Sequence, residues 1–271
     1  MKISGRGRFH RGVLLLPSLF TLGNLFCGLF ALRATADWPV HGPQHLERAA
    51  VFVIIAIVLD GLDGRIARLA HATSPLGMQL DSLADVVSFG VAPALLVYSW
   101  ALSGLGNIGW AVALLFAACG ALRLARFNVQ SADPTPSRDF QGLPIPAAAG
   151  AVAAVVFLRA EPVTDEWPRL AVAAGTLLLS LLMVSTVRYP SFKQLDVRRR
   201  QPLRTLLWIV VVFVVVSSEP QVALAAAAAL YVLSGPAGRL AHLVRSSSRG
   251  DSAEVTATVE RTDDPATTGD R

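Results

Sequence analysis

Long apolar runs alternate with short polar or charged gaps along most of this 271-residue chain. The runs predict helices at about 13–34, 47–70, 77–102, 106–130, 144–160, 167–187, 203–217 and 221–241. Several runs are shorter than the ~20 residues that a helix needs to cross a bilayer, so tilt or adjacent polar residues must complete those spans. The pattern therefore predicts an all-α polytopic membrane protein with about eight transmembrane helices.

Composition also indicates a bilayer. Hydrophobic residues make up 53% of the chain and charged residues 16%, whereas soluble domains carry about 25% charged residues. The net charge of +5 does not indicate a nucleic-acid partner, because the basic residues lie in the gaps between apolar runs. Cys27 and Cys119 both lie inside apolar runs, so we expect no disulfide framework.

The basic residues predict the orientation of the helices. If the N-terminus lies in the cytosol and eight helices alternate, the outside keeps few of the 24 Lys and Arg residues: Arg33, Arg48, Arg159 and Arg169. Lys and Arg collect on the cytosolic side of membrane proteins, so both termini are expected there. Residues 246–271 are polar, mixed in charge and free of aromatics, which predicts a disordered cytosolic tail.

Four aspartates stand out because they border long apolar runs. Asp60 and Asp63 are three residues apart and Asp81 and Asp85 are four apart, so each pair lies on one face of its helix. Pro75 breaks the helix between the pairs and lets the second helix return antiparallel to the first. Four converging carboxylates repel one another, and oxygen ligands suit Mg²⁺, Mn²⁺ or Ca²⁺ rather than zinc. The sequence therefore predicts a divalent-cation site.

Small residues and an arginine accompany these carboxylates. Gly64 and Ala67 lie beside the first pair and Gly77 beside the second, which leaves room for a polyanionic ligand. Arg68 offers a cation for phosphate. Cations, a floor of small residues and an arginine together indicate phosphoryl-type transfer.

The expected depth of the aspartates in the membrane favours the same chemistry. Asp60 lies roughly 20 Å along its helix from Glu47 at 1.5 Å per residue, within a hydrocarbon core of about 30 Å. The site is thus expected in the cytosolic leaflet, within reach of cytosolic reactants and lipid headgroups. A cation or proton transporter using the carboxylates as a relay is the competing class, but these acids cluster at one depth.

The spacing D-x2-D-G-x2-A-R-x8-G-x3-D-x3-D is filled without a gap from Asp60 to Asp85. This pattern resembles the signature of the CDP-alcohol phosphatidyltransferases. The resemblance implies that Asp60, Asp63 and Asp81 hold two divalent ions, Mg²⁺ or Mn²⁺, against the CDP pyrophosphate. It also implies that Asp85 is the base that deprotonates the acceptor hydroxyl. Whether Asp85 binds a metal as well stays open.

Further segments resemble the integral-membrane bacterial members of this family that use L-serine: FTLGNLFCGLFAL, DSLADVVSFGVAPA, ALRLARFNV, FQGLPIPAAAG and MVSTVRYPSFK. The resemblance covers most of residues 13–195. It implies transfer of the phosphatidyl group from CDP-diacylglycerol to L-serine, with CMP released. Glycerol 3-phosphate or inositol phosphate is the alternative acceptor within the family.

A serine acceptor needs a partner for its carboxylate. Arg123 and Arg126 lie one turn apart and could make bidentate contacts, with Asn128 beside them. The alternative is that these arginines are positive-inside anchors. Asn24 could contact the cytidine or phosphates of the donor, or hydrogen-bond a neighbouring helix. Further acceptor candidates of the same kind are Arg188 and Lys193.

These expectations divide the chain into four parts. Residues 1–12 form a basic cytosolic N-terminus, and 13–200 form the CDP-alcohol phosphatidyltransferase core with helices one to six. Residues 201–245 add two transmembrane helices, and 246–271 form the tail. The resemblance implies a bacterial inner-membrane enzyme with its active site facing the cytosol and with membrane lipid as a partner. It also implies a homodimer, because family members often form one.

Overall fold

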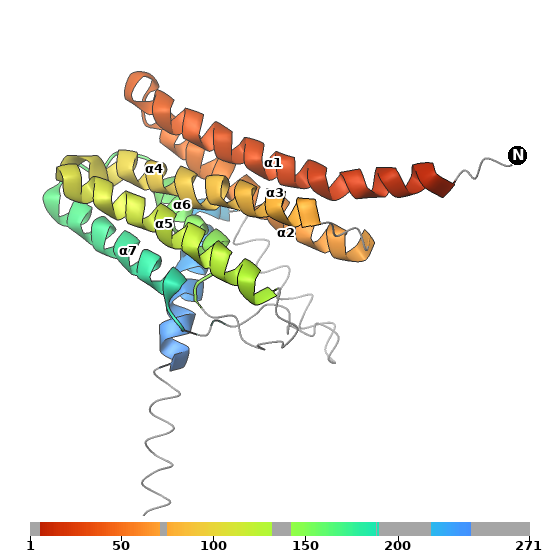
Figure 1. Cartoon of the computed structure of the whole chain (residues 1–271). Helices are drawn as coiled ribbons and strands as arrows, with labels where there is room; N and C mark the ends of the chain where they lie inside the picture. Colours follow the sequence, from red (N-terminus) through yellow and green to blue (C-terminus); the bar gives the residue numbers. More distant parts are fainter. Residues whose placement is uncertain (1–5, 71–74, 132–141, 188, 190–217, 240–271) are drawn as a thin grey trace, which may run out of the picture.

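The computed structural model describes residues 6–70, 75–131, 142–187, 189 and 218–239, which form helices and turns with no strand among them (Figure 1). The α-helices are α1 (Arg6–His41), α2 (Gln44–Ala70), α3 (Pro75–Asp85), α4 (Ala92–Val97), α5 (Gly106–Ser131), α6 (Ile145–Leu158) and α7 (Glu166–Val184). Wider π-helical turns, Val86–Val91 and Tyr98–Leu102, flank α4, and a 3₁₀ turn, Ser103–Leu105, precedes α5. A further helix spans Pro220–Arg239.

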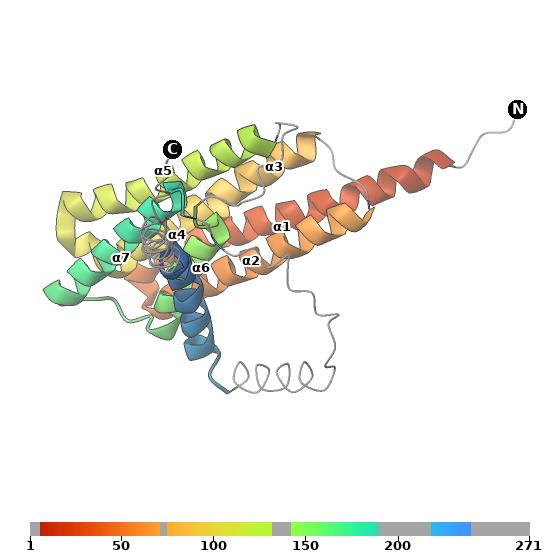
Figure 2. The same ribbon diagram turned by 90° about the horizontal axis from the view of Figure 1, so that it is seen from below.

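Antiparallel hairpins build the bundle. α1 packs along α2, and the chain reverses between them at Gly42, whose φ of 92° suits glycine. α1 also contacts α3, and Figure 2 shows it between α2 and α3. The continuous stretch from α3 through α4 then turns at Ser103–Leu105, and α5 runs back beside it. α6 packs on α2 and α4, and α7 packs on α5.

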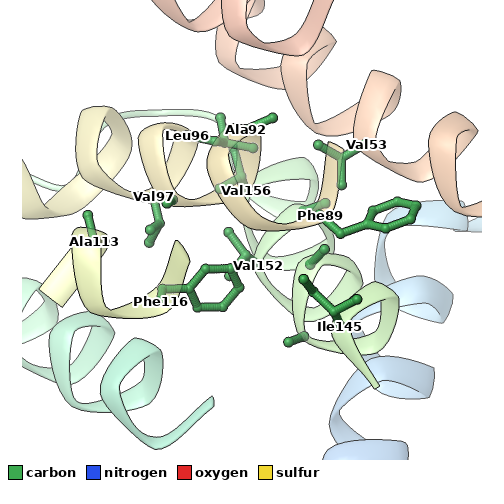
Figure 3. Packing of buried hydrophobic residues seen from close by; sticks show 14 of the residues in the cluster. Val53, Phe89, Ala92, Leu96, Val97, Ala113, Phe116, Ile145, Val152 and Val156 are labelled. Carbon is green, nitrogen blue, oxygen red and sulfur yellow. The ribbon is translucent and has the colours of Figure 1, made fainter. Parts of the chain in front are cut away.

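The core lies where these hairpins meet. Figure 3 shows Val53 of α2, Leu96 of α4, Phe116 of α5 and Ile145 of α6 turned toward one another, all buried. Hydrocarbon outside a membrane protein is as apolar as its core, so close packing rather than the hydrophobic effect holds such helices together. The core therefore gives α2, α3 and α5 fixed positions from which polar side chains can be aimed.

Within the part of the chain that the structure describes, four stretches are long and apolar enough to cross a membrane: Leu19–His41, Leu76–Gln130, Glu166–Val184 and Pro220–Arg239. The second of these contains two antiparallel arms. Helical residues overlap each predicted range except 203–217, which lies outside the described residues. The range 77–102 is divided among α3, α4 and the two π-helical turns. The count of eight transmembrane helices and the cytosolic termini therefore stay predictions.

The bounds of α1 differ most from the expectation. α1 begins at Arg6 and ends at His41, so it is longer than the apolar run 13–34. Hydropathy marks only the apolar part of a helix, whereas backbone hydrogen bonding continues through polar residues until a breaker. Here the positive φ of Gly42 ends the helix.

The helix α1 and the π-helical turn Val86–Val91 approach each other closely. Ser88 of that turn donates a hydrogen bond of 2.9 Å to the backbone carbonyl of Asn24. Gly28, one turn along α1, faces the same serine, and a Cβ at this glycine would lie 2.9 Å from Ser88 Cα. The absence of a side chain at Gly28 therefore lets α1 approach the segment that follows Asp85.

We expect Gly28→Ala to lower the thermal stability of the purified protein in detergent. The added Cβ must push α1 away from Ser88, and overpacking of this kind typically costs about 1–3 kcal/mol. Gly175→Ala in α7 is the matched control, because a Cβ there meets nothing within 4 Å. Equal melting temperatures for the two variants would contradict the close approach.

Candidate active site

A row of polar and small residues on α1 forms one wall of the site. Thr21, Asn24 and Gly28 are three and four residues apart, so they share one helix face. Thr21 is 3% exposed and Asn24 is completely buried. Buried polar groups require hydrogen-bond partners, and these two side chains find theirs on aspartates of α2 and α3.

Three of the four predicted aspartates converge. Carboxylate oxygens of Asp60, Asp81 and Asp85 all lie within 4.8 Å of one another. Asp60 and Asp81 are half-buried and Asp85 is buried. α2 supplies the first and α3 the other two, so the antiparallel arrangement predicted around Pro75 brings both helices to one point.

Asp63 lies beside this cluster rather than within it. Its side chain is buried and accepts a hydrogen bond of 2.5 Å from Thr21 Oγ1. It still interacts electrostatically with Asp60 and Asp81. Its Oδ1 is buried and has no partner among the described residues. That oxygen remains available to a cation, so its predicted role as a ligand stays a prediction.

Asn24 joins α1 to the predicted base. Its side-chain amide donates a hydrogen bond of 3.1 Å to Asp85 Oδ1. This is the contact with a neighbouring helix that the sequence offered as one of two alternatives. The amide oxygen of Asn24 is buried without a partner among the described residues, and its contact with the CDP moiety stays a prediction.

The predicted CDP-binding residues lie near the aspartates in the chain. Gly64 is exposed, and a Cβ there would meet nothing within 4 Å. Gly77 is half-buried in α3. Ala67 and Arg68 belong to α2, but their side chains lie outside what the structure describes. Open space at Gly64 fits the small-residue floor.

The predicted acceptor residues have unlike surroundings. Arg123 of α5 is half-buried, and its buried Nε has no partner among the described residues. Its charge interacts with Asp85. Arg126 and Asn128 are exposed, and Asn128 donates a hydrogen bond of 2.9 Å to Ser82 Oγ. Arg188 and Lys193 lie outside the described residues.

The charge balance fits a divalent cation. None of the four aspartates lies within salt-bridge distance of a described Lys or Arg residue. Three carboxylates held this close repel one another in surroundings poor in water. A set made of carboxylate oxygens alone suits Mg²⁺ or Mn²⁺. The cluster could therefore hold a divalent cation.

Two residues of the site were missed from the sequence. Thr21 holds Asp63, and Ser88 ties the segment after Asp85 to α1. The spacing of Thr21, Asn24 and Gly28 within an apolar run was an available signal, because it predicts a polar helix face. Ser88 gave no such signal, because its contact depends on the π-helical turn. Such turns are frequent at functional sites.

Comparison with known proteins decides the family. The model of the CDP-alcohol phosphatidyltransferase family matches residues 14–187. The chain belongs to this family. The resemblance stated from the Asp60–Asp85 spacing is thereby confirmed.

Named relatives of this CDP-alcohol phosphatidyltransferase cover most of its length. A CDP-diacylglycerol–serine O-phosphatidyltransferase of Helicobacter pylori (strain J99) is 39% identical over 222 residues, which are 82% of this chain and 89% of that protein. One of Bacillus subtilis (strain 168) is 40% identical over 66% of this chain and 92% of its own length. An archaetidylserine synthase of Methanothermobacter thermautotrophicus is 35% identical over 65% of this chain and 69% of its own length.

Thermal unfolding in detergent should show the cation site without any turnover. We expect Mg²⁺ or Mn²⁺ to raise the melting temperature of the wild type. At a cation concentration a hundredfold above Kd, binding adds about 2.7 kcal/mol to the free energy of unfolding. Asp81→Asn should shrink this shift because it removes one of three clustered oxygens. In EDTA the same variant should be at least as stable as the wild type, because one repulsive charge is gone.

Asp37→Asn is the control for this measurement, since Asp37 pairs with Arg33 at the far end of α1. Its cation shift should match that of the wild type. An undiminished shift in Asp81→Asn would show that the cation binds elsewhere.

Proposed function

We propose that this chain transfers the phosphatidyl group of CDP-diacylglycerol to the hydroxyl of L-serine, giving phosphatidylserine and CMP. The convergence of Asp60, Asp81 and Asp85 within 4.8 Å is the observation that carries this proposal. The acceptor comes from the relatives, because those of Helicobacter pylori and Bacillus subtilis are named CDP-diacylglycerol–serine O-phosphatidyltransferases.

The aspartates divide between two roles. Asp60, Asp63 and Asp81 hold two divalent ions, Mg²⁺ or Mn²⁺, and the free Oδ1 of Asp63 supports its part in this set. When bound, the ions offset the charge of the CDP pyrophosphate and of the departing CMP. Asp85 takes the proton of the serine hydroxyl as general base. Its hydrogen bond from Asn24 holds the carboxylate in one orientation.

The bond changes follow from these positions. The serine oxygen attacks the phosphorus that bears the diacylglycerol, and the bond from this phosphorus to the oxygen of the CMP phosphate breaks. The hydroxyl proton goes to Asp85. Positioning and charge neutralisation supply most of the rate in phosphoryl transfer, which is the contribution a rigid helical bundle can make.

Donor and acceptor approach from different helices. The CDP moiety binds along α2 and α3, at Gly64, Ala67, Arg68 and Gly77, and Asn24 of α1 is a further contact. The serine carboxylate pairs with Arg123, whose buried Nε–H has no partner among the described residues. Arg126 and Asn128, farther along α5, guide the acceptor from solvent.

The site opens toward the cytosol in this proposal. Asp60 lies ten residues before the end of α2, and Asp81 lies six residues after the start of α3. Figure 2 shows the end of the bundle where α2 stops and α3 begins. Eight transmembrane helices with both termini inside then place it on the inner face of the bacterial cell membrane. There it meets both a lipid donor and a soluble acceptor. We also propose a homodimer, as the family resemblance implies.

Release of CMP from CDP-diacylglycerol by the purified protein in detergent tests the reaction. We expect release that requires both serine and Mg²⁺ or Mn²⁺. Release with glycerol 3-phosphate or inositol phosphate instead would keep the aspartate chemistry and overturn serine as the acceptor. Cation flux across sealed vesicles without CMP release on any acceptor would overturn the enzyme in favour of a transporter.

Asp85→Asn separates the base from the cation ligands. Loss of a general base lowers turnover about 10²–10⁴-fold, whereas binding of CDP-diacylglycerol should stay close to that of the wild type. Asp37→Asn, remote from the cluster, should change neither quantity. If lipid binding falls as far as the rate does, Asp85 acts as a ligand and the role of base is wrong.

A further inference from the structure

Thr21 of α1 hydrogen-bonds one of the four aspartates on a different helix. Its hydroxyl donates a hydrogen bond of 2.5 Å to Oδ2 of Asp63 on α2, and both side chains are buried. A threonine inside a helix can donate instead to the backbone carbonyl one turn earlier in its own helix. Thr35, also on α1, does so with the carbonyl of Ala31 at 2.9 Å. The bond from Thr21 to another helix therefore requires a separate explanation.

Close packing of α1 holds this hydrogen bond in place. α1 packs along α2 and lies between α2 and α3 (Figure 2). Gly23, two residues after Thr21, approaches α2 so closely that a Cβ there would lie 3.3 Å from Cδ1 of Leu59. One turn after Thr21, Asn24 donates to Asp85 of α3. The helix α1 thus hydrogen-bonds one aspartate on each of its two neighbours.

The hydrogen bond determines which oxygen of Asp63 is left for a ligand. Oδ2 accepts the bond from Thr21, whereas Oδ1 is buried and has no partner among the described residues. A buried carboxylate oxygen without a partner is costly. Without the hydroxyl, the carboxyl group could rotate about its last side-chain bond, where rotation is soft. Thr21 therefore keeps Oδ1 in its present place.

Asp63 and the three clustered aspartates do not fit around a single ion as they lie. Oxygens of Asp60, Asp81 and Asp85 lie within 4.8 Å of one another, and Asp63 does not belong to this group. Two oxygens that bind one Mg²⁺ at about 2.1 Å lie no more than about 4.2 Å apart. Asp63 is therefore too far from at least one of the three. Its neighbour on the same helix face is Asp60, with which it can share a second ion.

We infer that Thr21 is a positioning residue for this second ion: it fixes Asp63 so that Oδ1, and not Oδ2, is the ligand. This role rests on the proposed function, which gives the aspartates two divalent ions. Thr21 acts through Asp63 and does not itself bind the cation. Loss of its hydroxyl should therefore weaken the binding of one ion and spare the other.

Binding of Mn²⁺ to the full-length protein in detergent tests this role without any turnover, with free Mn²⁺ measured by its electron paramagnetic resonance signal. Thr21→Val keeps the shape of the side chain and removes the hydroxyl. Loss of a partner that orients a metal ligand typically weakens metal binding 10–100-fold, so we expect the Kd of one ion to rise about 10-fold or more and that of the other to stay within about threefold. Unchanged Kd values, or equal changes for both ions, would overturn the inference.

Thr35→Val is the matched control, because Thr35 is a buried threonine of the same helix whose hydroxyl donates within that helix. Its Mn²⁺ binding should match that of the wild type. Thr21→Ser restores a hydroxyl at the same position, so its Kd values should lie close to those of the wild type. Binding as weak in Thr21→Ser as in Thr21→Val would assign the effect to packing and overturn the role of the hydroxyl.

A double-mutant cycle shows whether Thr21 acts through Asp63. Asp63→Asn removes the charge of the proposed ligand, so we expect it to weaken the same ion as Thr21→Val does. With Asp63→Asn already present, Thr21→Val should weaken Mn²⁺ binding no further, because residues that act as a pair are not additive. Fully additive effects on the binding free energy would show that Thr21 acts independently of Asp63, and the inference would be wrong.

The wild-type protein separates this inference from the function on which it rests. If it binds two Mn²⁺ ions but releases no CMP with any acceptor, the proposed reaction is wrong, and the binding variants still decide the role of Thr21. If it releases CMP with serine but binds a single ion, the reaction stands and the inference about Thr21 is overturned.

Discussion

The carboxylates of Asp60, Asp81 and Asp85 carry like charges within 4.8 Å of one another. The rest of the molecule must hold these charges together against their repulsion. Their repulsion is strong where water is scarce. The described residues supply no salt bridge to them. The hydrogen bond from Asn24 to Asp85, and the one from Thr21 to the neighbouring Asp63, offset only part of this repulsion. Helix packing must therefore hold the carboxylates together wherever no cation neutralises them.

That packing depends on small residues at close approaches rather than on large apolar ones. Gly28 lets α1 approach Ser88, and the same serine hydrogen-bonds the backbone of Asn24. The π-helical turn that begins at Val86 presents Ser88 to α1 immediately after Asp85. A turn of this kind is less stable than α-helix and persists where surrounding contacts hold it. Here the core around Phe89 and Phe116 supplies those contacts.

The sequence could predict the parts of the site that depend on spacing within one helix. The intervals Asp60–Asp63 and Asp81–Asp85 place each pair on one face, and Pro75 implies the reversal that lets them meet. The sequence could not predict contacts between distant segments, because helical periodicity shows which face of a helix is polar but not which residue lies opposite that face. Asp63 therefore has a partner, Thr21, that no local pattern could assign. Residues 203–217, which the sequence predicts to form a helix, lie outside the described residues.

The helix Pro220–Arg239 shows the same limit at its widest separation, because the ring that packs on its Tyr231 belongs to Tyr189, far back in the chain. Its position is informative because the residues that match the family end at 187. In the proposed reaction, the chemistry on the CDP moiety depends on the signature helices α2 and α3, which the family model covers. In the same proposal the acceptor contacts come from α5, which the family model also covers. Dividing the two substrates between helices in this way lets the acceptor contacts on α5 change while the carboxylates on α2 and α3 keep their positions.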